Sequence, residues 1–378
     1  MFTETTTTGY GSRIVNSIKG VVIGFILFVV SFGVLYWNEG RVDLSNIAKT
    51  ATEISAQTQN TDASLNGKLV SASGVVNSEP EQVISDNLFL KPDKFMAVER
   101  KVEMYAWVEK TETKSQTNIG GSETTETTYT YFLEWTEHPE PSSNFKQPEG
   151  HENPQKTLDS YTNKVTAAKI GVYNFDPQGA TLPNFSALPL NSQNVVLSQD
   201  AVLANDSYLF IRKSESGTFE SPQVGDLRIS YNVLHPNFDG SIFGKLSGDK
   251  IDPYFDQDDN RLYHVFAGTR EEGVATLHSE YTKMLWILRL VGFLLMWFGL
   301  AALFGPISVL LDILPIFGAI SRSLIGIITF AASIILTIVT IIVSAIIHSL
   351  VALVIALAVT IAAIIVFFVM WKKKRAAV

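Results

Sequence analysis

Four long runs of apolar residues frame one large polar region in this chain of 378 residues. The runs are residues 20–37, 284–304, 324–347 and 350–371. A helix needs about 17–25 apolar residues to cross the ~30 Å hydrocarbon core of a bilayer. The pattern therefore predicts four transmembrane helices, the last two joined as a tight hairpin, with residues 38–283 as an insertion between helices 1 and 2.

The first apolar run has the basic flank of a signal peptide, Arg13 and Lys19. It is longer than a usual signal core, and no small-residue cleavage site follows Trp37. These features favour an uncleaved membrane anchor over a cleaved signal peptide.

The polar region, residues 38–283, carries the two-residue apolar period of β-strands. The residues after Arg41 are compatible with a helix to about residue 60, and 157–170 is the one stretch that suggests a separate helix. The Thr-rich segment 111–128 suggests a long mobile loop. We predict an α+β domain dominated by antiparallel sheet, with strands at 101–110, 129–136, 208–212, 227–233 and 261–267.

Two segments beside the apolar runs also suggest helices. Residues 271–283 have apolar positions at helical spacing, so we expect one helix that continues into the second span. Residues 305–323 are apolar but short, which fits an interfacial helix or a re-entrant turn on the cytoplasmic side.

Basic residues close to the span ends predict the orientation. Residues 1–19 and the tail 372–378 are basic, so both termini are expected in the cytoplasm and 38–283 on the far side. That region has a net charge of −14, which argues against nucleic-acid binding because phosphates would be repelled. The chain has no cysteine, so it forms no disulfide and no thiolate metal site.

The polar region contains no nucleophile elbow, phosphate-binding loop, H-E-x-x-H or dinucleotide fingerprint. Four residues are weak candidates for a metal or acid–base site: Glu134, His138, His151 and Asn153. The two histidines are too far apart in sequence for a tight ligand pair, and a solvated loop is the favoured interpretation. Asn153 precedes a proline, which favours a turn over chemistry. We therefore predict no metal, no cofactor and no catalytic residue.

The first apolar run ends in Asn38, Glu39, Gly40 and Arg41, and Arg289 lies five residues inside the second. One interpretation is that Arg289 extends to the interface by itself. The other is a charge-assisted pair between Glu39 and Arg289 that fixes the polar domain at the membrane. In this hypothesis Gly40 permits a sharp turn and Arg41 contacts lipid headgroups.

The spans carry small residues suited to close helix packing, including Gly292 and Gly299 on one face. Apart from Arg289 they contain no charged residue, which disfavours a transporter.

Several motifs resemble the transmembrane protein 43 (LUMA) family over nearly the whole chain. They are Asn38–Arg41, Tyr129-x-Tyr131-x-x-Glu134-Trp135, Ser142-x-Asn144-Phe145, Gly150-His151-x-Asn153-Pro154, Val224–Arg228, the second span from Leu288 to Leu300, and Asp312-x-x-Pro315. The segment 111–128 departs from the family pattern.

The resemblance implies a non-enzymatic membrane protein that organises complexes and self-associates. It implies residence in the endoplasmic reticulum and inner nuclear membrane for a eukaryotic member, with lamins and emerin as partners in animals. A bacterial member would lie in the inner membrane, without those partners. We thus expect a scaffold that is a homo-oligomer in the lipid bilayer and binds an unidentified protein. The alternative is a metal- or ligand-binding domain or hydrolase-like enzyme centred on Glu134, His138 and His151.

Overall fold

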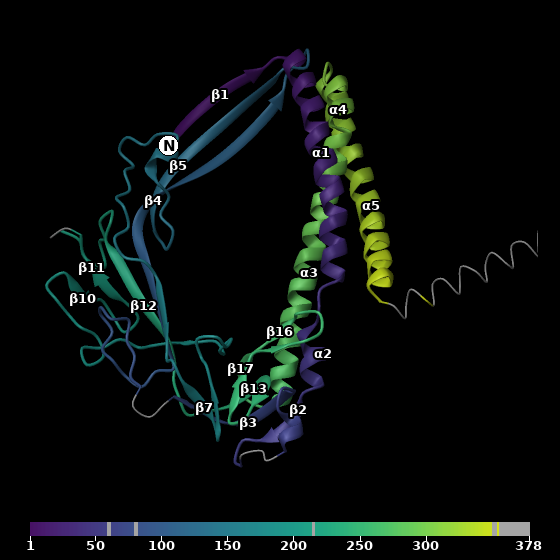
Figure 1. The fold of residues 1–378 in the computed structure, drawn as a ribbon. Coiled ribbons are helices and arrows are strands. Elements are labelled where there is room, and N and C mark those ends of the chain that lie inside the picture. The colour runs from purple at the N-terminus through teal and green to yellow at the C-terminus, as the bar shows by residue number, and fades with distance from the viewer. Residues whose placement is uncertain (59–61, 79–81, 214–215, 350–353, 355–378) are drawn as a thin grey trace, which may run out of the picture. The chain divides into compact units, whose positions relative to one another are not determined.

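The computed structural model contains both helices and strands in two compact units (Figure 1). It describes the chain except residues 59–61, 79–81, 214–215, 350–353 and 355–378. The β-rich unit comprises Met1–Thr3, Asp43–Glu112 and Thr127–Ser279. The helical unit comprises Glu4–Val42, Thr113–Glu126 and the chain from Glu280 onward.

Three helices are long and apolar enough to cross a membrane, among the residues that the structure describes. These candidate spans lie in Tyr10–Lys49, Arg270–Leu303 and Ile316–His348. The α-helices are α1 (Tyr10–Glu39), α2 (Leu44–Lys49), α3 (Arg270–Leu303), α4 (Gly305–Leu311) and α5 (Pro315–His348), and the 3₁₀ turns are η1 (Ala63–Leu65) and η2 (Ser142–Asn144). The predicted continuation of 271–283 into the second span is confirmed by α3.

The strands form two large sheets and one small hairpin. The first sheet has the order β1-β5-β4-β12-β11-β10, with β6 paired to β4 and β9 paired to β12. The second sheet has the order β17-β13-β14-β8-β7-β3-β2, with β13 also paired to β3. The hairpin is the pair β15 and β16. The strands are β1 (Phe2–Thr8), β2 (Thr52–Ser55), β3 (Leu69–Ser78), β4 (Ala97–Thr117), β5 (Glu123–Thr136), β6 (Tyr161–Lys164), β7 (Ala168–Ile170), β8 (Tyr173–Phe175), β9 (Ser186–Ala187), β10 (Ala201–Leu203), β11 (Leu209–Ile211), β12 (Leu227–Leu234), β13 (Phe238–Ser247), β14 (Lys250–Asp252), β15 (Tyr254–Phe255), β16 (Arg261–Leu262) and β17 (His264–Ala267).

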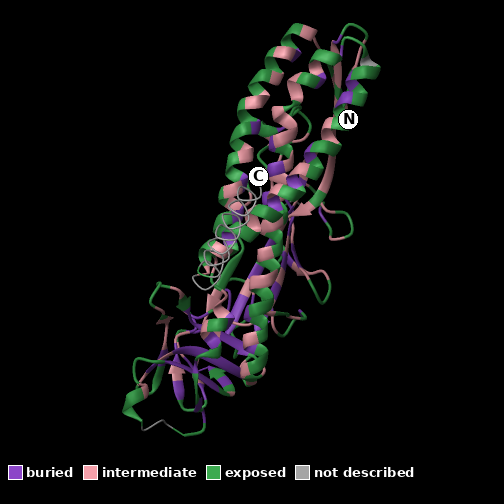
Figure 2. Ribbon diagram, turned by 90° about the vertical axis from the view of Figure 1, so that its right-hand side faces the viewer, coloured by how far each residue is buried: buried purple, intermediate pink, exposed green. Residues whose placement is uncertain are grey.

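The apolar core of the β-rich unit follows from strand alternation. In β12 the alternate residues Leu227, Ile229, Tyr231 and Val233 are buried, the residues between them are half-buried, and Leu234 at the strand end is also buried. Figure 2 shows buried positions gathered in the sheets, whereas the long helices carry mainly exposed and intermediate ones. The sheets therefore hold the water-excluding core of this unit.

One buried polar group stabilises this core. The carboxylate of Asp86 accepts hydrogen bonds from the backbone of residues 88–90, from Arg100 at 2.9 Å and from the Tyr231 hydroxyl at 2.6 Å. Burial opposes its ionisation, but the bonds from Tyr231, the backbone and Arg100 outweigh burial and lower the pKa of Asp86. The sequence analysis did not identify this group.

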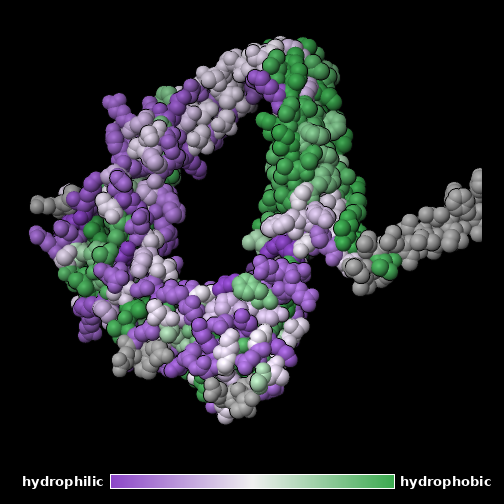
Figure 3. Space-filling view, viewed as in Figure 1, coloured by the Kyte–Doolittle hydropathy of each residue, from purple (hydrophilic) through white to green (hydrophobic). Residues whose placement is uncertain are grey.

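The helical unit presents apolar side chains on its surface. In Figure 3 the helices α1, α4 and α5 are covered by hydrophobic residues in this view. Exposed apolar side chains on the long helices include Val22, Phe25, Trp37, Ile327 and Ile335. Such a surface matches lipid better than water.

Three local expectations are wrong. Residues 157–170 form no helix but contain β6 and β7, because Tyr161–Lys164 pairs with β4 and Ala168–Ile170 pairs with β3 and β8. The helix after Arg41 ends at Lys49, and β2 follows, paired in parallel with β3.

The segment 111–128 is the third correction. It is not a long loop, because β4 extends to Thr117 and β5 begins at Glu123. Threonine favours strands, and the turn is closed by Gly120 and Gly121, whose φ angles are 86° and 81°.

The segment 305–323 contains α4 and the first residues of α5, so α5 includes the whole predicted third span. The predicted fourth span, 350–371, lies outside the described residues apart from Val354.

Candidate functional site

The end of α1 is joined to α3 by a two-pronged ion pair. Arg289 donates from Nε and Nη2 to the two carboxylate oxygens of Glu39, both at 2.8 Å. The Glu39 side chain is 6% exposed and that of Arg289 is 21% exposed. The guanidinium also lies 4.9 Å from the ring centre of Trp286. The structure thus contains the pair of the second interpretation, in which Arg289 binds Glu39.

The other residues of this motif also have specific contacts. Asn38 is buried and donates to the carbonyl of Leu285 at 3.0 Å. Arg41 lies 5.9 Å and 5.7 Å from the ring centres of Trp37 and Tyr281. These contacts join α1 to α3 next to the ion pair.

Gly40 has a different role from the predicted sharp turn. Its φ of −87° and ψ of −2° are accessible to any residue. The requirement is spatial, because a Cβ atom here would collide with the imidazole of His348 in the last turn of α5.

Gly292 and Gly299 pack inside the chain. A Cβ on Gly299 would lie 2.7 Å from the backbone nitrogen of Phe28 and 2.8 Å from the carbonyl oxygen of Gly24. A Cβ on Gly292 would lie 2.6 Å from the Leu35 side chain. These glycines bring α1 and α3 together, so any contact between copies must use other surfaces.

The opposite end of α1 holds a buried ionic cluster that sequence reasoning missed. Asp312, with a fully buried side chain, lies 2.6 Å from Nη2 of Arg13 and 2.6 Å from Nη1 of Arg322. Arg13 is also nearly buried, with 8% of its side chain exposed. We name Arg13, Glu123, Asp312 and Arg322 the amino-end cluster.

The fourth member of this cluster comes from the β4–β5 hairpin. Arg13 lies 2.8 Å from the carboxylate of Glu123 and donates to the carbonyl of Gly121 at 2.5 Å. The backbone N–H of Gly120 donates to the carbonyl of Ile313 at 3.1 Å. The hairpin tip, residues 117–123, therefore sits directly against the helix ends.

The contact brings together two residues that lie on opposite sides of the first apolar run in sequence, Arg13 before it and Glu123 after it. The charge-based prediction of orientation used only the residues at the span ends and had no information on which segments meet in space.

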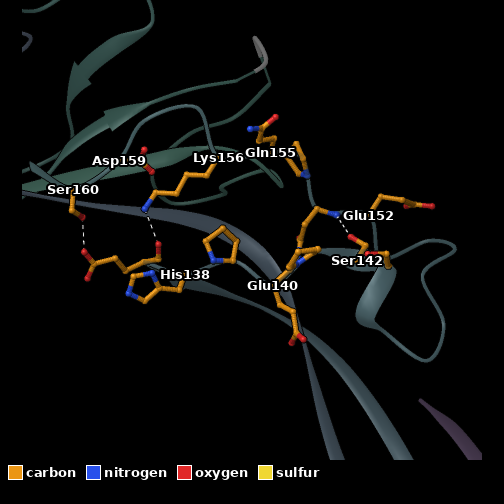
Figure 4. Close-up of a pocket in the computed structure, with 14 residues that line it drawn as sticks. His138, Glu140, Ser142, Glu152, Gln155, Lys156, Asp159 and Ser160 are labelled. Atoms are coloured by element: carbon orange, nitrogen blue, oxygen red, sulfur yellow. Dashed lines mark hydrogen bonds between the residues drawn. The ribbon is translucent and has the colours of Figure 1, made fainter.

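A separate cavity of about 850 Å³ lies in the β-rich unit between the end of β5 and β6 (Figure 4). It is lined by Glu137, His138, Pro139, Glu140, Pro141, Ser142, Ser143, Glu152, Asn153, Pro154, Gln155, Lys156, Asp159 and Ser160. Of the four weak candidates, only His138 and Asn153 line it. Glu134 is exposed on β5, and His151 lies outside the lining.

His151 and Asn153 have structural partners. The His151 ring stacks on Tyr131 at 3.8 Å and meets Trp107 edge-on at 4.8 Å. The Asn153 side chain accepts from the Trp107 N–H at 2.7 Å and donates to its carbonyl at 2.9 Å. The side chain thereby makes the two hydrogen bonds with the backbone of Trp107 that a neighbouring strand would otherwise make. Among the described residues no group of three His, Asp or Glu side chains is placed to hold a metal ion.

Charged groups of the cavity are held by hydrogen bonds. Lys156 donates to the carbonyls of Val102 at 2.8 Å and Glu137 at 2.7 Å, and burial lowers the pKa of its amine. The Ser160 hydroxyl donates to Glu137 at 2.5 Å and lowers the pKa of that carboxyl. Figure 4 shows both contacts on one wall. No serine, histidine and acid converge here as a nucleophilic triad would require.

Comparison with known proteins identifies the family. The model of the family described as transmembrane protein 43 matches residues 104–350, more than half of the chain. The chain belongs to the transmembrane protein 43 family. Transmembrane protein 43 of Mus musculus is 28% identical over 332 residues, covering 82% of this chain and 79% of that protein. The transmembrane protein 43 homolog of Drosophila melanogaster is 29% identical over 295 residues, covering 74% of each. No solved structure matches the chain.

The structure gives physical reasons for one motif that resembles the transmembrane protein 43 family, Val224–Arg228. Buried Asp226 accepts from the backbone of Lys213 at 2.8 Å and of Gln223 at 2.7 Å, closing the loop before β12. Arg228 pairs with Glu103 at 2.7 Å and lies 4.9 Å from the ring centre of Trp135. The motif therefore fixes β12 to its neighbours and provides no reactive group.

Proposed function

We propose that this membrane protein is a non-enzymatic scaffold that organises protein complexes through its β-rich unit and by self-association. The observation that carries the proposal is the closed packing of α1 on α3. The Glu39–Arg289 pair and the close approach of Gly24 and Gly299 hold these helices together. Outward apolar side chains such as Val22 and Phe25 remain for lipid or a second copy.

We further propose a four-span topology with both termini in the cytoplasm. The spans are residues 20–37, 284–304, 324–347 and 350–371. The first and third fall within α1 and α5, the second lies in α3 except for its last residue, and the fourth is supported by sequence alone. The membrane is the inner membrane of a bacterium or the endoplasmic reticulum and inner nuclear membrane of a eukaryote.

Mild crosslinking in cells, purification of the full-length protein and mass spectrometry test the scaffold proposal. A discrete homo-oligomer or one defined partner protein is the expected result. Two single-cysteine variants map the contact between copies: Val22→Cys on the outer face of α1, and Gly24→Cys on the face against α3. We expect a disulfide-linked dimer only from Val22→Cys. A monomer with no retained protein would contradict the proposal.

A second candidate function is binding of a small polar ligand in the cavity next to β6. The cavity volume and the three proline residues of its rim favour this candidate. Native mass spectrometry of the purified protein would show an added mass, and Ser143→Trp, which fills the cavity, would remove it. Identical spectra for the two proteins would dismiss ligand binding.

A further inference from the structure

The cavity in the β-rich unit carries an uneven balance of charge (Figure 4). Four carboxylates line it, those of Glu137, Glu140, Glu152 and Asp159. Among the described lining residues, Lys156 is the one lysine or arginine. Its amine is already held by the carbonyls of Val102 and Glu137. The carboxylates therefore outnumber the cations of the wall, and a concave surface lined by one sign of charge attracts ligands of the opposite sign.

Two of these carboxylates, those of Asp159 and Glu152, lie on opposite sides of the cavity in Figure 4. Glu152 accepts a hydrogen bond from the backbone N–H of Gly150 at 2.9 Å. In the described part of the chain, the hydrogen bonds of Asp159 are made by its backbone carbonyl, with Arg100. A carboxylate accepts about four hydrogen bonds, and both residues are exposed, so both side chains can still bind a cation.

Apolar rings separate the acids along each of the two chain segments that line the cavity. Residues 137–140 read Glu-His-Pro-Glu, and in residues 152–159 a proline also stands between the two terminal acids. Both prolines, Pro139 and Pro154, line the cavity. A ligand that reaches from the acids of one side to those of the other therefore passes over proline rings.

We infer that the cavity binds an extended organic dication, a diamine or polyamine that carries ammonium groups at both ends of an alkyl chain. One ammonium group pairs with Asp159, the other pairs with Glu152, and the alkyl chain lies on the proline rings. This ligand class rests on the second candidate function, the binding of a small polar ligand in the same cavity. The cavity volume of about 850 Å³ lies within the ~300–1,000 Å³ of small-molecule sites.

Three ligands of one chain length test the charge and its placement. Hexanediamine has two ammonium groups, hexylamine has one and hexanediol has none. Each is titrated into the full-length protein in a non-ionic detergent by isothermal titration calorimetry. We expect hexanediamine to bind about tenfold more tightly than hexylamine, the gain from one further charge-assisted contact, and hexanediol to give no binding. Equal affinities for the diamine and the monoamine, or no binding of either amine, would overturn the inference.

Magnesium chloride is the control for charge alone, because the ion carries two positive charges at a single point. It cannot reach both sides of the cavity at once, so we expect it to bind about tenfold more weakly than hexanediamine. Magnesium binding as tight as that of the diamine would show that the acidic surface, and not the shape of the cavity, is recognised, and would overturn the inference.

Two substitutions test the two ends of the site. Asp159→Asn and Glu152→Gln each remove one charge and keep the shape of the side chain. We expect each to weaken hexanediamine binding about tenfold. Asp258→Asn, on an exposed turn outside the cavity lining, is the matched control and should leave the affinity unchanged. Equal affinities in all three variants would overturn the two-ended site.

Native mass spectrometry separates the ligand class from the candidate function beneath it. Suppose that the purified protein carries an added mass that Ser143→Trp removes, while hexanediamine binds no better than hexanediol. The cavity then binds a ligand of another class, so the dication is wrong and the candidate function stands. If no added mass is found and hexanediamine does not bind, both are wrong.

Discussion

The two ends of α1 are both fixed by arginine and carboxylate, but they differ in how the charges are shared. At the carboxyl end one arginine meets one glutamate, Glu39 with Arg289. At the amino end Asp312 is shared by Arg13 and Arg322, and Arg13 also holds Glu123 of the hairpin tip.

The difference shows that the stability lost on replacing one charged residue depends on how many partners it has, more than on the distances to them. All of these pairs lie within 2.6–2.8 Å. Loss of Glu39 leaves one partly exposed cation, whereas loss of the Asp312 charge removes a shared partner from two cations, the nearly buried Arg13 and the partly exposed Arg322. A buried charge without its partner is costly, so the amino end is the more sensitive one.

The largest expected effect is therefore that of Asp312→Asn. The amide has no charge to balance Arg13 and Arg322 and stands at a position without any exposure, although Arg322 is partly exposed and Arg13 keeps its pair with Glu123. We expect a loss of about 3–5 kcal/mol in the free energy of unfolding. Denaturant unfolding of the detergent-solubilised protein, followed by tryptophan fluorescence, measures it.

The matched control for this change is Asp258→Asn on an exposed turn of the β-rich unit. Its effect is expected to stay within about 0.5 kcal/mol. Equal losses of unfolding free energy from the two substitutions would show that Asp312 does not stabilise the amino end of α1.

Next in size is Glu39→Gln at the carboxyl end. Glutamine keeps one oxygen to accept from Arg289 but loses the charge, and Arg289 retains the ring of Trp286. We expect a loss of about 1.5–3 kcal/mol, the range for hydrogen bonds to charged groups. In a double-mutant cycle with Arg289→Gln, most of this loss should appear as coupling. If Glu39→Gln loses as much unfolding free energy as Asp312→Asn, the amino end of α1 is not the more sensitive one.

The sequence suggested a pair at one end, as one of two interpretations, and none at the other end, for a physical reason. Glu39 and Arg289 each stand at an outer margin of an apolar run, so packing two antiparallel spans brings them together. Asp312 stands among apolar residues, and its contacts include a hairpin tip that is distant in sequence. Which segments meet there depends on tertiary structure, and no spacing in the chain records it.

The strands, too, include some that the sequence predicted and some that it did not. Alternation over residues 129–136 and 227–233 predicted strands correctly. Residues 227–233 have one face on the core, whereas residues 129–136 are half-buried apart from the exposed Glu134. The short strands β6 and β7 were missed, because three or four residues carry too little period to separate strand from helix. The candidate site fared least well, because His151 and Asn153 are held by Trp107 in contacts that the sequence does not encode locally.

A smaller effect is expected between the two ends, where α1 crosses α3. Gly299→Ala places a methyl group against the backbone of Phe28 and Gly24, which cannot move aside as a flexible side chain would. We expect a loss of about 1–3 kcal/mol from overpacking, measured by the same unfolding assay. Gly20→Ala is the control, since nothing lies within 4 Å of that position. It should be neutral or slightly stabilising. A neutral Gly299→Ala would mean that the ion pairs alone hold the helices.

The smallest predicted effect is a pH dependence of stability that arises in the β-rich unit and not in the ion pairs at the ends of α1. The pairs contain no histidine, whereas burial lowers the pKa of His264 in β17 to about 4, and its Nδ1 has no hydrogen-bond partner. The unfolded chain, with an ordinary histidine pKa of about 6.5, then binds a proton more readily than the folded one. Stability is therefore full above that value and is lost as the pH falls toward 4. Between pH 7 and pH 6 we expect a loss of about 0.7 kcal/mol in the free energy of unfolding, removed by His264→Gln but not by His138→Gln on the surface. If His264→Gln keeps the loss, the acid-sensitive group lies elsewhere, and the ends of α1 would have to be searched for it.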